Sequence, residues 1–107
     1  MKLRINPLVS NDLKNIRDFI SEEGIGNIDA IITEIYNVME MLQQFPVMGS
    51  NLSKRVSFET DYKYFIHKDY IIIYLIHYDN IEIYRIIDRR QDFIAMLFDT
   101  STDQNEG

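Results

Sequence analysis

Apolar positions in the first half of the chain recur at helical spacing. They predict a helix over residues 11–23, capped by Ser10 or Asn11, and a second helix over 28–44, capped by Asn27. The positions that set this spacing are Leu13, Ile16, Phe19, Ile20, Ile28, Ile31, Ile32, Ile35, Met39 and Leu42. A joint that contains two glycines separates the helices, so we expect an antiparallel helical hairpin.

The pattern on either side of this hairpin is that of β-structure. Residues 2–7 alternate apolar and basic side chains and end at a proline, which favours a short N-terminal strand. After residue 54, β-branched and aromatic residues dominate four segments, at 55–58, 62–67, 70–78 and 81–88. Short polar turns separate these segments. Because such turns join antiparallel neighbours, the sequence predicts a meander.

Together these elements predict an α+β fold with one domain over residues 1–98. The N-terminal strand is followed by the helical hairpin, which packs on one face of a curved antiparallel sheet of three to four further strands. Residues 90–98 are expected to form a short C-terminal helix, with Phe93, Met96 and Leu97 on one face. Residues 99–107 are polar and acidic and contain no basic side chain, so we expect a flexible acidic tail.

Composition narrows the classes of function. The chain has 107 residues, no cysteine and two histidines, so we expect neither a metal site nor a cofactor. Its net charge of -6 opposes non-specific binding to nucleic acid, which needs a basic surface. The sequence shows neither a signal peptide nor an apolar run of about 20 residues, so we expect a cytoplasmic protein that does not enter a membrane.

Three arginines cluster near the end of this acidic chain, and they are Arg85, Arg89 and Arg90. On a strand, Arg85 is expected to share a face with Ile83 and Ile87, where burial requires a charged partner. The nearby carboxylates are those of Asp88 and Asp92. The cluster has three interpretations: a structural ion-pair network, contact with a macromolecular target, or catalysis.

Several motifs occur along the chain in a characteristic order. They are an apolar strand-forming start, the helix stop LQQFPVMG, the strand DYIIIYLI and the segment YRIIDRRQD. In this order they resemble the RelE/ParE superfamily of toxins from bacterial type II toxin-antitoxin modules of the plasmid-stabilisation type. The matching positions are Leu42, Pro46 and Gly49 in the helix stop, and Arg85, Ile86, Arg90 and Asp92 in the last segment. The resemblance covers residues 2–97.

This resemblance implies a small protein that halts growth unless a co-expressed antitoxin wraps and blocks it. RelE-like members cleave messenger RNA in the ribosomal A site, whereas ParE-like members poison DNA gyrase. The chain has Asp88 where the family signature usually has His, and Arg89 where a small residue is usual. It has Ile71 where ribonuclease members commonly have Arg. These departures favour the ParE-like branch, which inhibits its target by protein contact.

Two alternatives stay open. The first is a RelE-like, ribosome-dependent endoribonuclease that works without a metal. The cations that remain for a phosphate in that case are Lys54, Arg55, Lys63, Arg85 and Arg90. Proton transfer would then fall to His67 or His77. The second alternative is a decayed member that binds its antitoxin without toxicity.

The strand at 70–76 has apolar residues on both faces, and the helical hairpin covers only one of them. The other face is left for the last helix, a twin subunit or an antitoxin segment. The expected contact surface for antitoxin or target consists of Ile71, Ile73, Leu75, Arg89, Arg90, Phe93, Met96 and Leu97. The assembly would be a homodimer or a heterotetramer with the antitoxin. Because the chain is acidic, the antitoxin is expected to carry basic residues.

Overall fold

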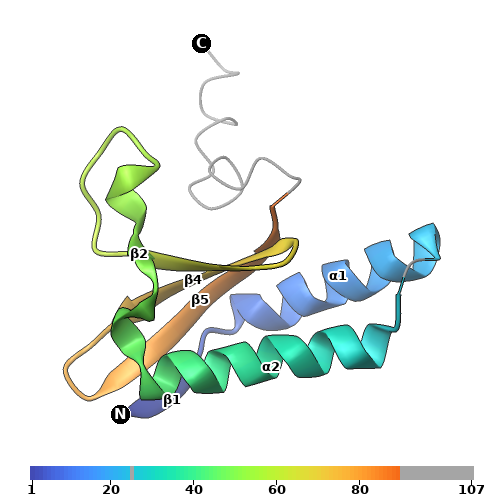
Figure 1. The fold of residues 1–107 in the computed structure, drawn as a ribbon, viewed down its shortest axis with the longest axis horizontal. Coiled ribbons are helices and arrows are strands. Elements are labelled where there is room, and N and C mark those ends of the chain that lie inside the picture. The colour runs from blue at the N-terminus through green and yellow to red at the C-terminus, as the bar shows by residue number, and fades with distance from the viewer. Residues whose placement is uncertain (25, 90–107) are drawn as a thin grey trace.

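The structure is a computed structural model that describes residues 1–24 and 26–89 (Figure 1). Its elements are β1 (Lys2–Ile5), α1 (Leu8–Glu23), α2 (Ile28–Gln44), β2 (Ser50–Asn51), β3 (Lys63–His67), β4 (Tyr70–Ile76) and β5 (Asn80–Asp88). Two short 3-10 helices, η1 (Pro46–Met48) and η2 (Leu52–Lys54), flank β2. The helix predicted at 90–98 and the tail at 99–107 lie outside the described residues, and so do Arg90, Asp92, Phe93, Met96 and Leu97.

The strands form one mixed sheet in the order β1-β5-β4-β3-β2. The neighbours from β2 to β5 are antiparallel, which confirms the predicted meander, but β1 pairs with β5 in parallel. The predicted antiparallel sheet is therefore confirmed for β2 to β5, and the N-terminal strand, whose direction was not predicted, makes the whole sheet mixed. The reason is that both helices and three strands separate β1 from β5 along the chain, so no short turn sets their relative direction.

The two helices lie side by side and antiparallel on one face of the sheet, which confirms the predicted hairpin (Figure 1). Between the helices and the sheet lies the main core, which consists of Val9, Ile16, Ile20, Ile35, Val38, Met39, Leu42, Tyr70, Ile72, Tyr74, Ile81, Ile83 and Ile86. Most of the apolar positions that set the helical spacing belong to this core or pack against it. Removal of this apolar surface from water is the main driving force for the layered arrangement.

The caps explain where each helix begins. α2 spans the predicted residues, and the side chain of Asn27 accepts a hydrogen bond of 3.1 Å from the N–H of Ala30. α1 begins at Leu8, so both of its predicted caps lie inside the helix. The side chain of Asn6 accepts a hydrogen bond of 2.9 Å from the N–H of Leu8, and Pro7 presets a helical φ. The helix therefore begins before its apolar spacing becomes regular.

The segment 55–58, which was predicted as a strand, is not a strand in the structure. Just before it, Leu52 is fully buried and forms a second core cluster with Ile71 and Ile73 of β4. The partly buried neighbours of this cluster are Val56, Tyr62, Tyr64, Ile66 and Tyr84. The stretch that includes Leu52, Val56 and Tyr62 thus covers the face of β4 that the helices leave open.

A side-chain contact closes this covering loop. The hydroxyl of Ser53 donates to the carbonyl of Thr60 at 3.0 Å and accepts from the N–H of Thr60 at 2.9 Å. These two hydrogen bonds hold the ends of the loop together and satisfy backbone groups that a strand would otherwise pair. The strand prediction for residues 55–58 rested on the residue types of these four positions alone. Those residue types do not reveal the hydrogen bonds between Ser53 and Thr60, so the prediction was incorrect.

Candidate functional site

An irregularity in β5 decides where its charged side chains point. The register with β4 shifts between Ile73 and Tyr74, so that Ile83 lies opposite Tyr74 and Arg85 lies opposite Ile73. Tyr84 is the extra residue of this β-bulge. Directly opposed residues share a face, so Ile83 faces the helices and Arg85 leaves the strand on the other face. The prediction that these two residues share a face is wrong because the bulge interrupts the alternation.

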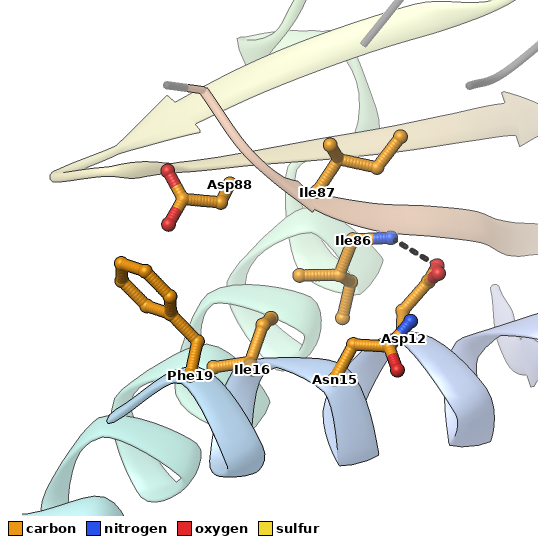
Figure 2. A pocket seen from close by; sticks show the side chains of 7 residues that line it. All are labelled: Asp12, Asn15, Ile16, Phe19, Ile86, Ile87 and Asp88. Atoms are coloured by element: carbon orange, nitrogen blue, oxygen red, sulfur yellow. Dashed lines mark hydrogen bonds between the residues drawn. The ribbon is translucent and has the colours of Figure 1, made fainter. Parts of the chain in front are cut away.

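The guanidinium group of Arg85 forms a bidentate ion pair with Asp12 of α1. Its Nε donates to Oδ2 of Asp12 and its Nη2 donates to Oδ1, both at 2.8 Å. The backbone N–H of Ile86 also donates to Oδ2 at 2.9 Å, as Figure 2 shows. The side chains of Asp12 and Arg85 are 3% and 14% exposed, so the pair is largely removed from water. The hydrogen bonds with Asp12 raise the pKa of Arg85 above its ordinary value, and this arginine stays charged.

Asp12 occupies this place because β1 is shorter than β5. β1 ends at Ile5, opposite Ile83, and the N–H of Asn6 donates to the carbonyl of Ile83 at 2.9 Å. Beyond that bond, no described strand lies beside β5 on this edge. The carboxylate of Asp12 accepts the N–H of Ile86 there, and α1 thereby continues the hydrogen bonding that β1 began.

The sequence around Arg85 does not identify Asp12 as its partner, because the two residues are 73 positions apart. A signal was nevertheless present. Asp12 lies at helical spacing from Val9 and Ile16, in the middle of the apolar stripe of α1, and all three are buried. A charged residue on a buried stripe requires a charged partner. Of the three interpretations of the arginine cluster, the ion-pair network describes Arg85.

A small pocket lies between α1 and the end of β5, next to this ion pair (Figure 2). Its lining consists of Asp12, Asn15, Ile16, Phe19, Ile86, Ile87 and Asp88. Asp88, which stands where the family signature usually has His, is 9% exposed. The volume is about 100 Å³, whereas pockets for small-molecule ligands have about 300 to 1,000 Å³. This pocket is therefore large enough for the end of one side chain and too small for a nucleotide.

The other described cations contact different groups. The guanidinium carbon of Arg55 lies 4.9 Å from the ring centroid of Tyr64. Lys63 donates from Nζ to Oδ1 of Asn51 at 2.9 Å, and Lys54 is exposed at the end of η2. Lys63 and Tyr64 are successive residues of β3, so Arg55 and Lys63 belong to opposite faces of the sheet. None of the described contacts brings two of these cations to a common acceptor.

The two histidines lie near opposite ends of β4, because His67 ends β3 opposite Tyr70 and His77 follows Ile76. Nε2 of His67 is 3.8 Å from Oε1 of Glu34, an oxygen that also accepts from Nζ of Lys68 at 2.8 Å. The hydrogen bond from Lys68 lowers the pKa of Glu34. Nε2 of His77 is 2.9 Å from Oε1 of Glu82. The histidines lie near different carboxylates, and at 3.8 Å His67 makes no hydrogen bond to Glu34, so the two do not act together at one proton-transfer site.

The family of the chain follows from a comparison with protein-family models. Residues 3–93 match the model described as ParE toxin of type II toxin-antitoxin system, parDE. The chain belongs to the ParE toxin family. ParE toxins pair with a cognate antitoxin, so the match confirms both the toxin-antitoxin resemblance and the class of partner expected from the sequence. A search of curated proteins gave no match. None of the described helices is both long and apolar enough to cross a membrane.

The residues expected at the partner surface of this ParE-family chain differ in exposure. Ile71 and Ile73 are 1% and 0% exposed within the second core cluster, so other residues of the same chain cover them. Leu75, near the end of β4, is partly exposed. The N–H of Arg89 donates to the carbonyl of Asp69 at 2.7 Å, and its Nη1 donates to the carbonyl of Lys68 at 3.2 Å. Arg89 is exposed and holds the turn between β3 and β4.

Proposed function

We propose that this ParE-family toxin arrests growth by binding a protein target such as DNA gyrase, without cleaving RNA, and that a cognate antitoxin neutralises it. The observation that carries the proposal is the buried ion pair between Arg85 and Asp12. The family signature contains Arg85 and Arg90, and of these Arg85 lies in the described part of the chain. The carboxylate of Asp12 already offsets the charge of Arg85.

The chemistry of RNA cleavage explains why this ion pair matters. Attack of a 2′-hydroxyl on the adjacent phosphate needs a base, a proton donor for the leaving oxygen and cations around the developing charge. If Arg85 moved to a phosphate, the carboxylate of Asp12 would be left buried without a cation, with only the N–H of Ile86 as its donor, at a cost of about 3–5 kcal/mol. Arg85 is therefore better suited to stabilise β5 than to bind a substrate.

The two positions that depart from the ribonuclease pattern support the same proposal. Ile71 stands where ribonuclease members commonly have Arg, and its side chain is buried in the second core cluster. Asp88 replaces the usual His and is buried at the end of β5. A carboxylate beside a phosphate would oppose the cations that stabilise the transition state. Neither residue supplies what a ribonuclease needs at its position.

Cleavage of messenger RNA is the second candidate, and an aromatic surface favours it. The rings of Tyr62 and Tyr84 have centroids 5.0 Å apart, and Arg55 stacks on Tyr64. Aromatic rings and arginine planes are the groups on which single-stranded RNA bases stack. Arg55 belongs to this surface and is not held in a described ion pair, so its substitution separates the two candidates.

The test is induced expression of the chain in bacteria, with DNA breaks and messenger RNA cleavage measured in the same culture. We expect growth arrest with gyrase-dependent DNA breaks and intact messenger RNA, and relief of the arrest by the co-expressed antitoxin. Cleavage in the ribosomal A site that Arg55→Ala abolishes, without a loss of thermal stability, would establish the second candidate instead. Normal growth at a high level of folded protein would identify a decayed member.

A further inference from the structure

β1 forms one edge of the sheet, and no strand in residues 1–24 and 26–89 pairs with its outer side. On its inner side, the N–H of Lys2 donates to the carbonyl of Asp79 at 3.0 Å. Just after β1, the N–H of Asn6 likewise donates toward β5, to the carbonyl of Ile83. Backbone groups alternate in direction along a strand, so the N–H and C=O groups of Leu3 and Ile5 point away from β5. This edge therefore offers two donors and two acceptors in the arrangement of a β-ladder.

The side chains along this edge differ between the two faces of the sheet. Leu3 packs against the main core on the helix side, and Ile5, on the same side, is 40% exposed. Lys2 and Arg4 point to the opposite side, and both are exposed. The edge thus combines apolar side chains on one face with two cations on the other.

A second copy of this chain does not suit the edge. In an antiparallel pair that uses the outward groups of Leu3 and Ile5, Arg4 lies directly opposite Arg4 or Lys2 of the second copy. Like charges in directly opposed positions are destabilising, and charged edge residues commonly prevent such self-pairing. On its inner side Arg4 lies opposite Glu82 of β5, and on the outer side Lys2 and Arg4 attract a strand that carries carboxylates at alternate positions.

We propose that the outer edge of β1 receives an extended segment of the antitoxin in which Asp or Glu alternates with apolar residues. The apolar side chains of this segment lie beside Leu3 and Ile5, and its carboxylates lie opposite Lys2 and Arg4. This inference rests on the proposed function, because it takes the antitoxin as the source of the segment. The net charge of -6 attracts a basic partner overall, whereas this edge selects an acidic segment within that partner.

Two labelled peptides test the chemistry of the edge without the antitoxin. In one, valine alternates with glutamate, and in the other, valine alternates with lysine. We expect the glutamate peptide to bind at least about tenfold more tightly, and Lys2→Glu combined with Arg4→Glu to reverse this preference. Equal affinities, or no measurable binding of the glutamate peptide, would refute the proposal.

A proline at Ile5 tests the hydrogen bonding of the edge. Ile5→Pro removes an N–H that points away from β5, so the pairing between β1 and β5 is kept, and Ile5→Val is the matched control. We expect Ile5→Pro to weaken binding of the glutamate peptide at least about tenfold, while Ile5→Val binds like the parent and both keep their melting temperatures. Unchanged binding by a folded Ile5→Pro variant would overturn the proposal.

The complex with the antitoxin separates this inference from the proposed function. We expect antitoxin binding to slow hydrogen exchange of the amides of Leu3 and Ile5, and Ile5→Pro to weaken the complex at least about tenfold. If the antitoxin relieves growth arrest while these amides exchange freely, the edge is not its site, although the toxin function stands. If expression of the chain does not arrest growth, the proposed function fails, and the peptide affinities still decide whether the edge selects an acidic strand.

Discussion

The hydroxyl of Tyr74 accepts a hydrogen bond of 3.0 Å from the backbone N–H of Gly49. It also donates to the carbonyl of Pro46 at 2.7 Å, and Tyr74 is 0% exposed. One buried phenol in β4 thus satisfies two backbone groups just after α2 ends, and burial raises the pKa of its hydroxyl. The helix stop recognised in the sequence is therefore fixed to the centre of the sheet.

Gly49→Ala should lower the free energy of unfolding by about 1–3 kcal/mol. A Cβ at this position would overlap the hydroxyl of Tyr74 and lie 2.6 Å from the carbonyl oxygen of Tyr64. Gly24→Ala is the control, because its Cβ meets no atom within 4 Å and only the positive φ of 65° opposes it, at about 1 kcal/mol. Urea unfolding measures both variants. A smaller loss for Gly49→Ala than for Gly24→Ala would contradict the close approach.

Tyr74→Phe should destabilise the fold by about 1–3 kcal/mol, because the N–H of Gly49 and the carbonyl of Pro46 lose their shared partner inside the protein. Tyr78→Phe removes the same hydroxyl from a fully exposed ring and should leave the stability unchanged. Thermal unfolding of the two variants gives the comparison. Equal melting temperatures would show that water replaces the lost hydroxyl.

Asp12→Ala should destabilise the fold by about 3–5 kcal/mol, because it leaves the guanidinium of Arg85 largely buried without this carboxylate and removes an acceptor from Ile86. Asp12→Leu combined with Arg85→Met removes both charges and should recover most of the loss. Denaturant unfolding measures the series. If Asp12→Ala does not fold, Asp12→Asn provides the single-residue comparison. A double variant as unstable as the single one would exclude the ion pair as the cause.

Glu82→Gln should make stability less sensitive to acid. Glu82 accepts a hydrogen bond from Asn6 and lies 2.9 Å from Nε2 of His77, and these contacts lower its pKa below the ordinary value of 4.5. Glu82 therefore binds a proton more readily in the unfolded state than in the folded state. The stability that ionised Glu82 gives the fold is complete above about pH 5 and is lost as the pH falls through the pKa of Glu82 in the folded state. The melting temperature of Glu82→Gln should fall less steeply from about pH 5 to pH 3, whereas Tyr78→Phe should follow the parent. Parallel curves for all three proteins would contradict this.

Phe93→Glu combined with Leu97→Glu should weaken antitoxin binding by at least ~2 kcal/mol, because buried apolar anchors dominate interface energy. This prediction comes from the apolar spacing at 90–98 alone, since these residues lie outside the described part of the chain. Calorimetric titration with the antitoxin measures the effect, and the melting transition of the isolated variant reveals any loss of fold. Unchanged affinity in a folded variant would place the interface elsewhere.

The predictions from sequence succeeded where short-range spacing decides the structure. Asn27 caps α2 as expected, because a cap and the helix it opens lie within four residues of each other. The apolar residues on both faces of β4 correctly indicated cover on both sides, but the source of that cover depends on the buried position of Leu52. The spacing of apolar residues does not predict that Leu52 is buried, because the segment around it is neither a long helix nor a long strand.

The candidate site was harder to predict because its contacts are long-range. A bulge at Tyr84 changes the face of every later residue in β5. The spacing of the core isoleucines lengthens there, from two residues between Ile81 and Ile83 to three between Ile83 and Ile86, but such a break does not by itself identify a bulge. The pairing of Arg85 with Asp12 requires knowledge that α1 lies beside the end of β5. Charge and residue type correctly indicated that Arg85 needs a partner, but only the three-dimensional fold identified which carboxylate it is.

The parallel pairing of β1 with β5 also has a consequence for biosynthesis. β1 emerges from the ribosome first, but its partner groups extend to the carbonyl of Ile83, near the other end of the described chain. Antiparallel neighbours can form as each turn is synthesised, whereas this long loop closes only after β5 has been translated. The sheet is therefore completed only when β5 is available, and a nascent toxin that still lacks β5 lacks the finished fold.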